Sequence, residues 1–173
     1  LATRKGVTVR EGTEEDIDIF YNIMKTTGSR DKFFIRPKEY FQRIFKELGK
    51  EHVKLFIAEF EGKPISVVMP VKYGNKVWYL YGGSSNEHRN LMPNYLLQWE
   101  MIKWGLNSGC EIYDFRGVSG FKDPKDPQYG IYKFKKGFNG DFVEFVNELY
   151  IEFNPLMNKA FNIAEKIYKK LSK

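Results

Sequence analysis

The first fifty residues have apolar positions at helical spacing after one short run of strand character. The pattern predicts a strand over 7–10 and a helix over 17–28, which is expected to end at Gly28. Residues 13–16 (TEED) resemble a capping box at the start of that helix. A second helix is predicted to open at Pro37, because proline is favoured in the first helical turn. Its expected inner stripe consists of Tyr40, Phe41, Ile44, Phe45 and Leu48.

Apolar and polar residues alternate through the middle of the chain, which is typical of strands. Three antiparallel strands are predicted over 53–60, 65–73 and 77–82, because short glycine-containing turn sequences separate them. Pro93 is expected to begin a long amphipathic helix that ends at Asn107. The residues expected on the inner face of this helix are Leu97, Met101, Trp104 and either Tyr95 or Trp99.

The last third of the chain again changes from strand to helix. A strand is predicted over 111–115, a short helix over 129–136 and a further strand over 142–153. Residues 154–155 (NP) are expected to cap a final helix with one apolar face. This order of elements predicts an α/β (α+β) fold, in which one mixed sheet is flanked by helices within a single domain over 1–173.

Composition and charge reduce the number of protein classes to which this chain could belong. The 173 residues are 42% hydrophobic and 17% aromatic, which is ample material for one core. No run of about 18 apolar residues and no apolar signal segment is present, so neither a membrane span nor a signal peptide is predicted. The net charge of +6 favours anionic partners. The single cysteine, Cys110, excludes an internal disulfide and fits a reducing cytoplasm.

Residues 111–140 contain the densest group of candidate functional side chains. A loop rich in glycine, proline, aspartate and lysine follows the predicted strand, and residues 132–136 (YKFKK) place aromatic and basic side chains together. Such a segment suits a negatively charged, planar partner such as the end of a nucleic acid. The alternative is a solvated amphipathic turn of helix, with Phe134 and Phe138 pointing inward.

The order of elements resembles the GNAT acyltransferase fold, whose members bind coenzyme A at a glycine-rich helix start after the fourth strand. The corresponding residues here, 81–90 (YGGSSNEHRN), lack the patterned glycines at the helix entry, and Glu87 would repel phosphate. Coenzyme A is therefore not expected. His52 and His88 do not have metal-ligand spacing, so no metal is predicted. No nucleophile stands out, so catalysis would depend on positioning and charge stabilisation.

Two motifs occur in order: residues 113–118 (YDFRGV) are followed by 130–138 (GIYKFKKGF). Together they resemble the second, C-terminal acyltransferase-like domain of the Fem family of tRNA-dependent peptidoglycan aminoacyltransferases. Supporting matches are 30–33 (RDKF), 36–41 (RPKEYF) and the opening 2–7 (ATRKGV), so the resemblance covers nearly the whole chain. The opening looks like the end of the family's first domain, and the chain begins without methionine. We therefore expect it to be part of a longer, two-domain polypeptide.

The resemblance implies transfer of an amino acid from aminoacyl-tRNA to an amine on the stem peptide of a peptidoglycan precursor, carried on UDP or on lipid. Aminoacyl-tRNA is then a co-substrate, and no cofactor is expected. Lys135 matches a lysine thought to stabilise the tetrahedral oxyanion or the tRNA end, and Phe134 matches an aromatic residue that stacks on the terminal adenosine. The alternative for Lys135 is a solvent-facing lysine among three.

Precursor binding is the second role that the resemblance implies. Arg36 and Tyr40 match residues that contact the diphosphate and its neighbourhood, and they would lie one turn apart at a helix start. The alternative is an exposed arginine with the tyrosine in the core. Tyr79 and Tyr81 match tyrosines that line the precursor cleft, and they are expected to point to one face of a strand.

Two further residues, Arg30 and Arg116, are weaker candidates for substrate binding, and the alternative for Arg116 is a salt bridge with Asp114 that braces the loop. The family's first domain supplies much of the precursor site and is not in this sequence, so the chain alone is expected to fold but to be inactive or impaired. The resemblance implies a cytoplasmic location, at the inner face of the membrane for lipid-linked acceptors. Two other functions stay open: a CoA-dependent N-acyltransferase, and a non-catalytic module that binds RNA or precursor.

Overall fold

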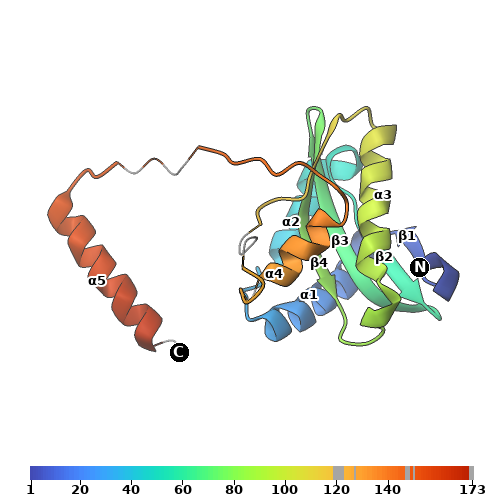
Figure 1. Cartoon of the computed structure of the whole chain (residues 1–173), viewed down its shortest axis with the longest axis horizontal. Coiled ribbons are helices and arrows are strands. Elements are labelled where there is room, and N and C mark those ends of the chain that lie inside the picture. Colours follow the sequence, from blue (N-terminus) through green and yellow to red (C-terminus); the bar gives the residue numbers. More distant parts are fainter. Residues whose placement is uncertain (119–122, 127, 147–148, 150, 172–173) are drawn as a thin grey trace. The chain divides into compact units, whose positions relative to one another are not determined.

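The computed structural model describes residues 1–118, 123–126, 128–146, 149 and 151–171. The chain forms two compact units, Leu1–Lys135 and Lys136–Lys173, and each is described by itself. Figure 1 shows that the first unit contains the sheet and the helices around it, whereas the second contains one helix and an extended segment.

Five strands of the first unit form one mixed sheet in the order β1-β2-β3-β4-β5, among the residues that are described. The first three pairings are antiparallel, and β4 pairs with β5 in parallel. The predicted mixed sheet is therefore confirmed. The strands are β1 (Thr8–Glu11), β2 (Phe56–Phe60), β3 (Lys63–Tyr73), β4 (Lys76–Ser84) and β5 (Ile112–Asp114).

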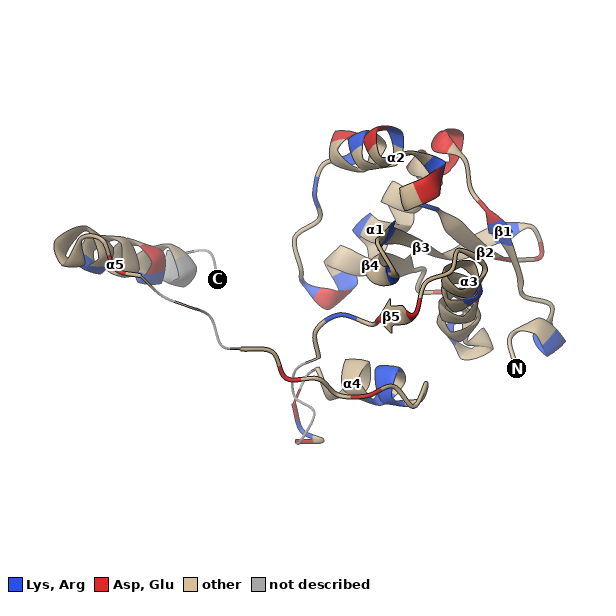
Figure 2. Ribbon diagram, turned by 90° about the horizontal axis from the view of Figure 1, so that it is seen from above, with Lys and Arg blue, Asp and Glu red and all other residues tan. Residues whose placement is uncertain are grey.

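Helices cover both faces of the sheet (Figure 2). α1 (Ile17–Asp31) and α2 (Lys38–His52) pack on one face, which we call the α1/α2 face, and α3 (Pro93–Asn107) packs on the other, the α3 face. The core of the α1/α2 face includes Phe20, Phe41, Leu55, Ile57, Val67 and Met69. The core of the α3 face includes Val7, Ala58, Val68, Val77, Leu97, Met101 and Cys110.

The start of α1 is as predicted, but its end is not. The Thr13 backbone N–H donates to the Asp16 carboxylate at 2.8 Å, and a short 3-10 turn leads into the helix. Gly28 does not end the helix, which continues to Asp31 and is capped by Lys32 in the left-handed conformation. A Cβ at Gly28 would lie 2.6 Å from Cγ1 of Ile35, so this glycine permits close packing instead.

Helix edges account for the errors in the predicted inner stripes. On α2, Phe41 and Phe45 are buried, whereas Tyr40 and Leu48 are 37% and 40% exposed. The predicted bounds of α3 are confirmed, and Leu97, Met101 and Trp104 are buried, but Tyr95 and Trp99 are exposed. An aromatic side chain at the edge of an apolar stripe can reach solvent, so periodicity alone overestimates its burial.

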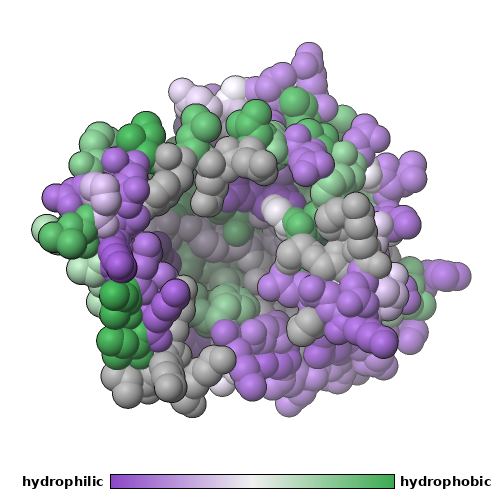
Figure 3. Space-filling view, turned by 60° about the vertical axis from the view of Figure 1, so that its left-hand side comes forward, coloured by the Kyte–Doolittle hydropathy of each residue, from purple (hydrophilic) through white to green (hydrophobic). Residues whose placement is uncertain are grey.

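The second unit contradicts one predicted strand and confirms the last helix. No described residue of 142–153 belongs to a strand. Alternation gives a segment strand character, but a strand also needs a neighbour for its backbone hydrogen bonds, and these residues pair with none. α5 (Pro155–Leu171) follows as predicted. Exposed hydrophobic residues of this unit include Phe145, Val146, Leu149, Phe153, Leu156 and Phe161. Figure 3 colours hydrophobic residues green on one face of the molecule.

Candidate functional site

Tyr79 and Tyr81 lie on opposite faces of the sheet, so the prediction that they share one face is wrong. Val71 opposes Trp78, but Met69 opposes Tyr81, which leaves one extra residue on β4 between these pairs. Such a β-bulge shifts the alternation of side chains by one position. Tyr79 therefore packs on the α3 face and Tyr81 on the α1/α2 face.

Tyr81 belongs to an aromatic and cationic cluster on the α1/α2 face. Its hydroxyl is 2.8 Å from the hydroxyl of Tyr40, and its ring meets Phe41 edge-on at 5.2 Å between centroids. The guanidinium carbon of Arg36 lies 5.7 Å from the centre of the Tyr40 ring. Burial raises the pKa of Tyr81 to about 12, while the positive charges of Arg36 and Arg116 act in the opposite direction. The cluster thus presents neutral phenols beside exposed cations.

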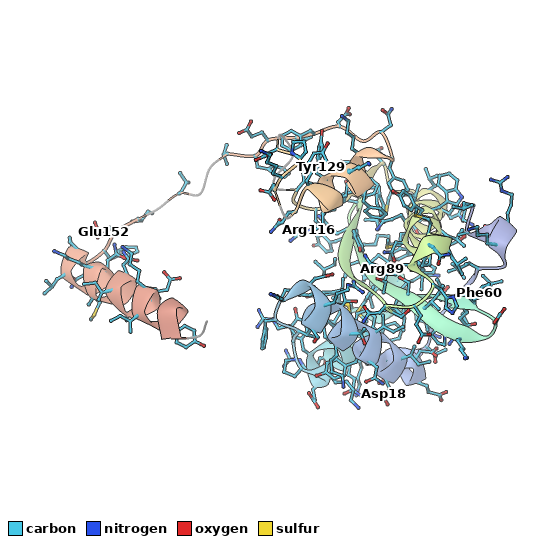
Figure 4. The ribbon with its side chains drawn as sticks, turned by 60° about the horizontal axis from the view of Figure 1, so that its bottom comes forward. Asp18, Phe60, Arg89, Arg116, Tyr129 and Glu152 are labelled. Atoms are coloured by element: carbon cyan, nitrogen blue, oxygen red, sulfur yellow. The ribbon has the colours of Figure 1, made fainter. Side chains whose placement is uncertain are left out.

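Arg116 lies at the exit of β5 and connects that cluster to α4 (Tyr129–Lys136). Its backbone N–H donates to Asp114 Oδ1 at 2.7 Å, and its backbone is left-handed with φ 64°. The predicted brace is thus a backbone hydrogen bond, and Asp114 pairs with Lys76 Nζ at 3.7 Å. Figure 4 shows Arg116 beside α4. Its charge influences both Tyr81 and Lys135.

α4 orients Lys135 towards the β5 exit. The Lys135 ammonium donates to the carbonyl oxygen of Gly117 at 2.8 Å and to that of Arg116 at 3.4 Å. Burial lowers the pKa of Lys135, and Arg116 lowers it further, whereas Asp114 opposes the shift. Lys135 is half-buried while its neighbour Lys133 is exposed, so the two lysines differ in environment.

Phe134, which also lies on α4, contacts the start of α3. Its ring meets that of Tyr95 edge-on with 4.8 Å between centroids. Both residues line a pocket of about 140 Å³. An aromatic ring at the wall of a pocket with both acidic and basic residues is suited to stacking on a planar group. The other lining residues are Ile65, Ser84, Glu87, Arg89, Met92, Pro93 and Asn94.

The guanidinium of Arg30 makes several hydrogen bonds within the protein. Its guanidinium donates to the Ser84 carbonyl oxygen at 2.9 Å, to Asn86 Oδ1 at 3.1 Å and to the carboxylate of Asp31. Thr27, one turn earlier on α1, accepts the backbone N–H of Ser84 at 2.8 Å. These bonds fix the end of β4, so Arg30 holds the strand that carries the two tyrosines.

On the α3 face, the predicted Tyr79 belongs to a polar group with Gln98 and Tyr113, neither of which the sequence predicted as a site residue. Gln98 on α3 is buried and accepts a hydrogen bond of 2.6 Å from the Tyr113 hydroxyl. Tyr113 and Tyr79 interact electrostatically, and burial raises the pKa of both, that of Tyr79 to about 12. The available signal was a glutamine at an inward helical position, next to Leu97 and three residues before Met101.

The sequence predicts neither a metal site nor a membrane span. Within the described ranges, no group of three or more His, Cys, Asp and Glu side chains could hold a metal ion. No helix in the described part of the chain has the length and apolar character needed to cross a bilayer.

Known structures place this arrangement in the GNAT-like class of acyltransferase folds, as predicted. The crystal structure of FemX matches with a TM-score of 0.72 and 25% identity, over 78% of this chain and 50% of that one. An aminoglycoside acetyltransferase from a soil metagenome matches with a TM-score of 0.59 and 16% identity, over 86% of this chain and 97% of that one. The second likeness shows the fold alone.

The chain belongs to the FemAB family, whose model matches residues 1–63 and 61–166, and the predicted family is thereby confirmed. A lipid II:glycine glycyltransferase of Staphylococcus epidermidis is 26% identical, over 100% of this chain and 56% of that protein. A UDP-N-acetylmuramoylpentapeptide-lysine N(6)-alanyltransferase of Weissella viridescens is 34% identical, over 84% of this chain and 43% of that protein. The chain thus spans about half the length of these relatives.

Proposed function

We propose that this chain is the C-terminal catalytic domain of an aminoacyltransferase that moves an amino acid from aminoacyl-tRNA to an amine on the stem peptide of a peptidoglycan precursor. Membership of the FemAB family and the names of its relatives support the reaction class. The observation that carries the proposal is the position of Lys135, which α4 holds at the β5 exit next to Arg116.

The donor side of the reaction is assigned to α4 and the start of α3. Phe134 would stack on the terminal adenosine of the tRNA, a contact worth about 1–3 kcal/mol per base. Lys135 would face the ester that joins the amino acid to the ribose. Its ammonium is held by two backbone carbonyl oxygens, which contribute no formal charge, so it can direct positive charge at an oxyanion.

The acceptor side is assigned to the α1/α2 face. Arg36 and Arg116 are exposed and would pair with phosphate oxygens of the precursor, while Tyr40 and Tyr81 line the approach with neutral hydroxyls. The contact between the two hydroxyls fixes the Tyr40 and Tyr81 rings relative to each other. Arg30 is assigned a positioning role, because its contacts hold the end of β4.

In the proposed reaction the neutral stem-peptide amine attacks the carbonyl carbon of the aminoacyl ester. A C–N bond forms, the carbonyl oxygen becomes an oxyanion, and Lys135 stabilises its charge. Collapse of this intermediate breaks the C–O bond to the ribose. The proton lost by the attacking nitrogen goes to the departing ribose oxygen, so the products are an amide and a free tRNA hydroxyl.

A transfer assay with the whole gene product tests this function. Radiolabelled glycyl- or alanyl-tRNA is incubated with UDP-N-acetylmuramoyl-pentapeptide or with lipid II, and label in the precursor is measured. Lys135→Met should lower kcat by about 10²-fold or more, because an oxyanion donor is lost. Lys133→Met on the exposed side of the same helix should leave the rate unchanged.

Three outcomes would overturn parts of the proposal. Equal rates for the two lysine variants would remove the role of Lys135. Transfer from acetyl-CoA, with none from aminoacyl-tRNA, would replace the donor class. Binding of both substrates by the wild-type protein without any transfer would leave a non-catalytic binding module.

A further inference from the structure

The buried face of α3 contains an amide whose hydrogen-bonding capacity is only half used. Gln98 is 1% exposed, and its Oε1 accepts from the Tyr113 hydroxyl at 2.6 Å. Its Nε2 has no hydrogen-bond partner among the described residues. Turning the amide over would give Nε2 a partner and deprive Oε1 of one. In either orientation one polar end of a buried side chain is unsatisfied, which costs stability.

The partner of this amide lies on the strand that pairs with β4, because Tyr113 opposes Val77. β5 pairs with β4 only up to Trp78, and no described strand covers 79–84 on the side away from β3. The Tyr79 side chain lies over Gly82 on the α3 face, where an added Cβ would be 2.7 Å from its Cε2 atom. Tyr79 in turn interacts with the hydroxyl of Tyr113 that holds Gln98.

α4 encloses the same region from outside. Through Phe134 it contacts Tyr95, which lies on α3 three residues before Gln98. Through Lys135 it contacts the backbone beyond β5. α4 therefore joins α3 to the β5 exit, and Ser84 of the open edge lines the same pocket as Phe134 and Tyr95. A group that enters beneath α4 would reach this edge from the α3 face.

We propose that Gln98 is a binding residue for the aminoacyl end of the donor, and that its Nε2–H donates to the carbonyl oxygen of the amino acid before transfer. Tyr113 is the positioning residue, because its hydroxyl holds Oε1 and so directs Nε2. The inference rests on the proposed function. It adds a neutral, buried hydrogen-bond donor on the α3 face to the cationic donor, Lys135, on α4.

The chemistry of the site favours an uncharged oxygen atom at Gln98 over an anionic one. The three polar groups are an amide and two phenols, and burial raises the pKa of both phenols, so all three are neutral at physiological pH. A neutral donor in a buried site matches a neutral acceptor, because a charged group there would lose its hydration without a counter-charge. An ester carbonyl is such an acceptor.

The test measures binding of two RNA hairpins to the whole gene product. Each hairpin ends in CCA, and its terminal adenosine carries glycine through a 3′-amide that cannot be transferred. In the second hairpin the carbonyl oxygen of this amide is replaced by sulfur, a weak hydrogen-bond acceptor. The wild-type protein should bind the oxygen form about tenfold more tightly. Gln98→Met, which keeps the side-chain length, should lower this ratio several-fold and leave only the part that Lys135 contributes.

Two variants make the result specific. Gln42→Met places the same change on α2 and should keep the wild-type ratio of the two dissociation constants. Tyr113→Phe frees the Gln98 amide and should lower the ratio by a few fold, and it provides the test if Gln98→Met does not fold. The double variant Gln98→Met/Tyr113→Phe should raise the midpoint of thermal unfolding, since an unsatisfied polar group is removed together with its partner.

The outcomes separate this inference from the function on which it rests. If the wild-type ratio also persists in Gln98→Met, Gln98 does not contact the carbonyl and the inference fails alone. A buried water bound to Nε2 would give the same result. If the wild-type protein binds neither hairpin, the proposed donor is wrong, and the inference fails with it.

Discussion

The two faces of the sheet contain different kinds of polar group. On the α1/α2 face, Tyr81 and Tyr40 stand beside the exposed guanidinium groups of Arg36 and Arg116. On the α3 face, Tyr79, Tyr113 and Gln98 are neutral and largely buried. Solvent-exposed cations suit a diphosphate, whereas neutral, largely buried groups suit an uncharged carbonyl oxygen. Under the proposed function, we expect the donor and the acceptor to approach from opposite faces.

The β-bulge in β4 is what makes this division possible. Without the extra residue, Tyr79 and Tyr81 would point to the same face, and both would serve one substrate. With it, a single short segment contributes one tyrosine to each face. Beyond Trp78, no described strand pairs with β4 on the side of β5, so this edge of the strand is open. The two faces of the sheet meet along this open edge.

Loss of a cation on the α1/α2 face should give the largest effect specific to the precursor. Arg36→Met and Arg116→Met should each raise KM for UDP-N-acetylmuramoyl-pentapeptide by about tenfold or more, since a charge-assisted hydrogen bond to phosphate is lost. Steady-state kinetics at saturating aminoacyl-tRNA measure this change. Tyr113→Phe is the control on the opposite face and should leave this KM unchanged.

A different result would contradict the assignment of one substrate to each face of the sheet. If Arg36→Met instead weakened binding of aminoacyl-RNA and left the precursor KM unchanged, the α1/α2 face would receive the donor. Equal effects of the Arg36 and Tyr113 variants on the precursor KM would mean that one substrate spans both faces.

The order and type of most elements could be predicted from local sequence. The bounds of α3 follow from Pro93 at its start and from a regular apolar stripe, and α4 follows from the spacing around Phe134. These signals are local, because capping residues and helical periodicity act within one or two turns. The family motifs added the residues of the candidate site, which local patterns alone left with two interpretations each.

Features that depend on pairing between distant segments could not be predicted. The bulge arises where β4 has one residue more than β3, and the alternation within 77–82 gives no sign of it. The half-satisfied amide of Gln98 depends on Tyr113, which is fifteen positions away in sequence and on another element. The expected strand over 142–153 failed for the same reason, since a strand needs a partner that its own sequence does not specify.

The contact between α1 and the end of β4 provides a smaller, structural test. Thr27→Val removes the oxygen that accepts the buried Ser84 N–H, so it should lower the free energy of unfolding by about 1–3 kcal/mol in urea denaturation. Thr26→Val is a matched control, because the Thr26 hydroxyl donates only to the Asn22 carbonyl oxygen at an exposed position. Its effect should be within about 0.5 kcal/mol.

These two variants also test how the tyrosines are held. If Thr27→Val lowered stability no more than Thr26→Val, the end of β4 would be fixed by other contacts, such as those of Arg30. The transfer rate should fall with Thr27→Val at temperatures where the protein remains folded, because both tyrosines lie on the strand that Thr27 anchors.

The smallest expected effect concerns the electrostatic separation of the two faces. Burial raises the pKa of Tyr79 and of Tyr81 from 10.0 to about 12. Each phenol therefore stabilises the fold fully below the unfolded pKa, and this contribution is lost as pH rises through the folded value. The positive charge of Arg116 lowers the pKa of Tyr81, whereas burial alone accounts for that of Tyr79. Arg116→Met should thus raise the pKa of Tyr81 only.

Tyrosine labelled with ¹³C at Cζ allows both phenols to be followed by NMR. At about pH 11, below both folded pKa values, the ionised fraction of Tyr81 should be smaller in Arg116→Met than in the wild-type protein. That of Tyr79 should not change, because burial alone accounts for the pKa of Tyr79. A parallel change at both residues would show that Arg116 acts through the open edge of β4 on both faces, and the charged and neutral sides of the site would then form one electrostatic environment.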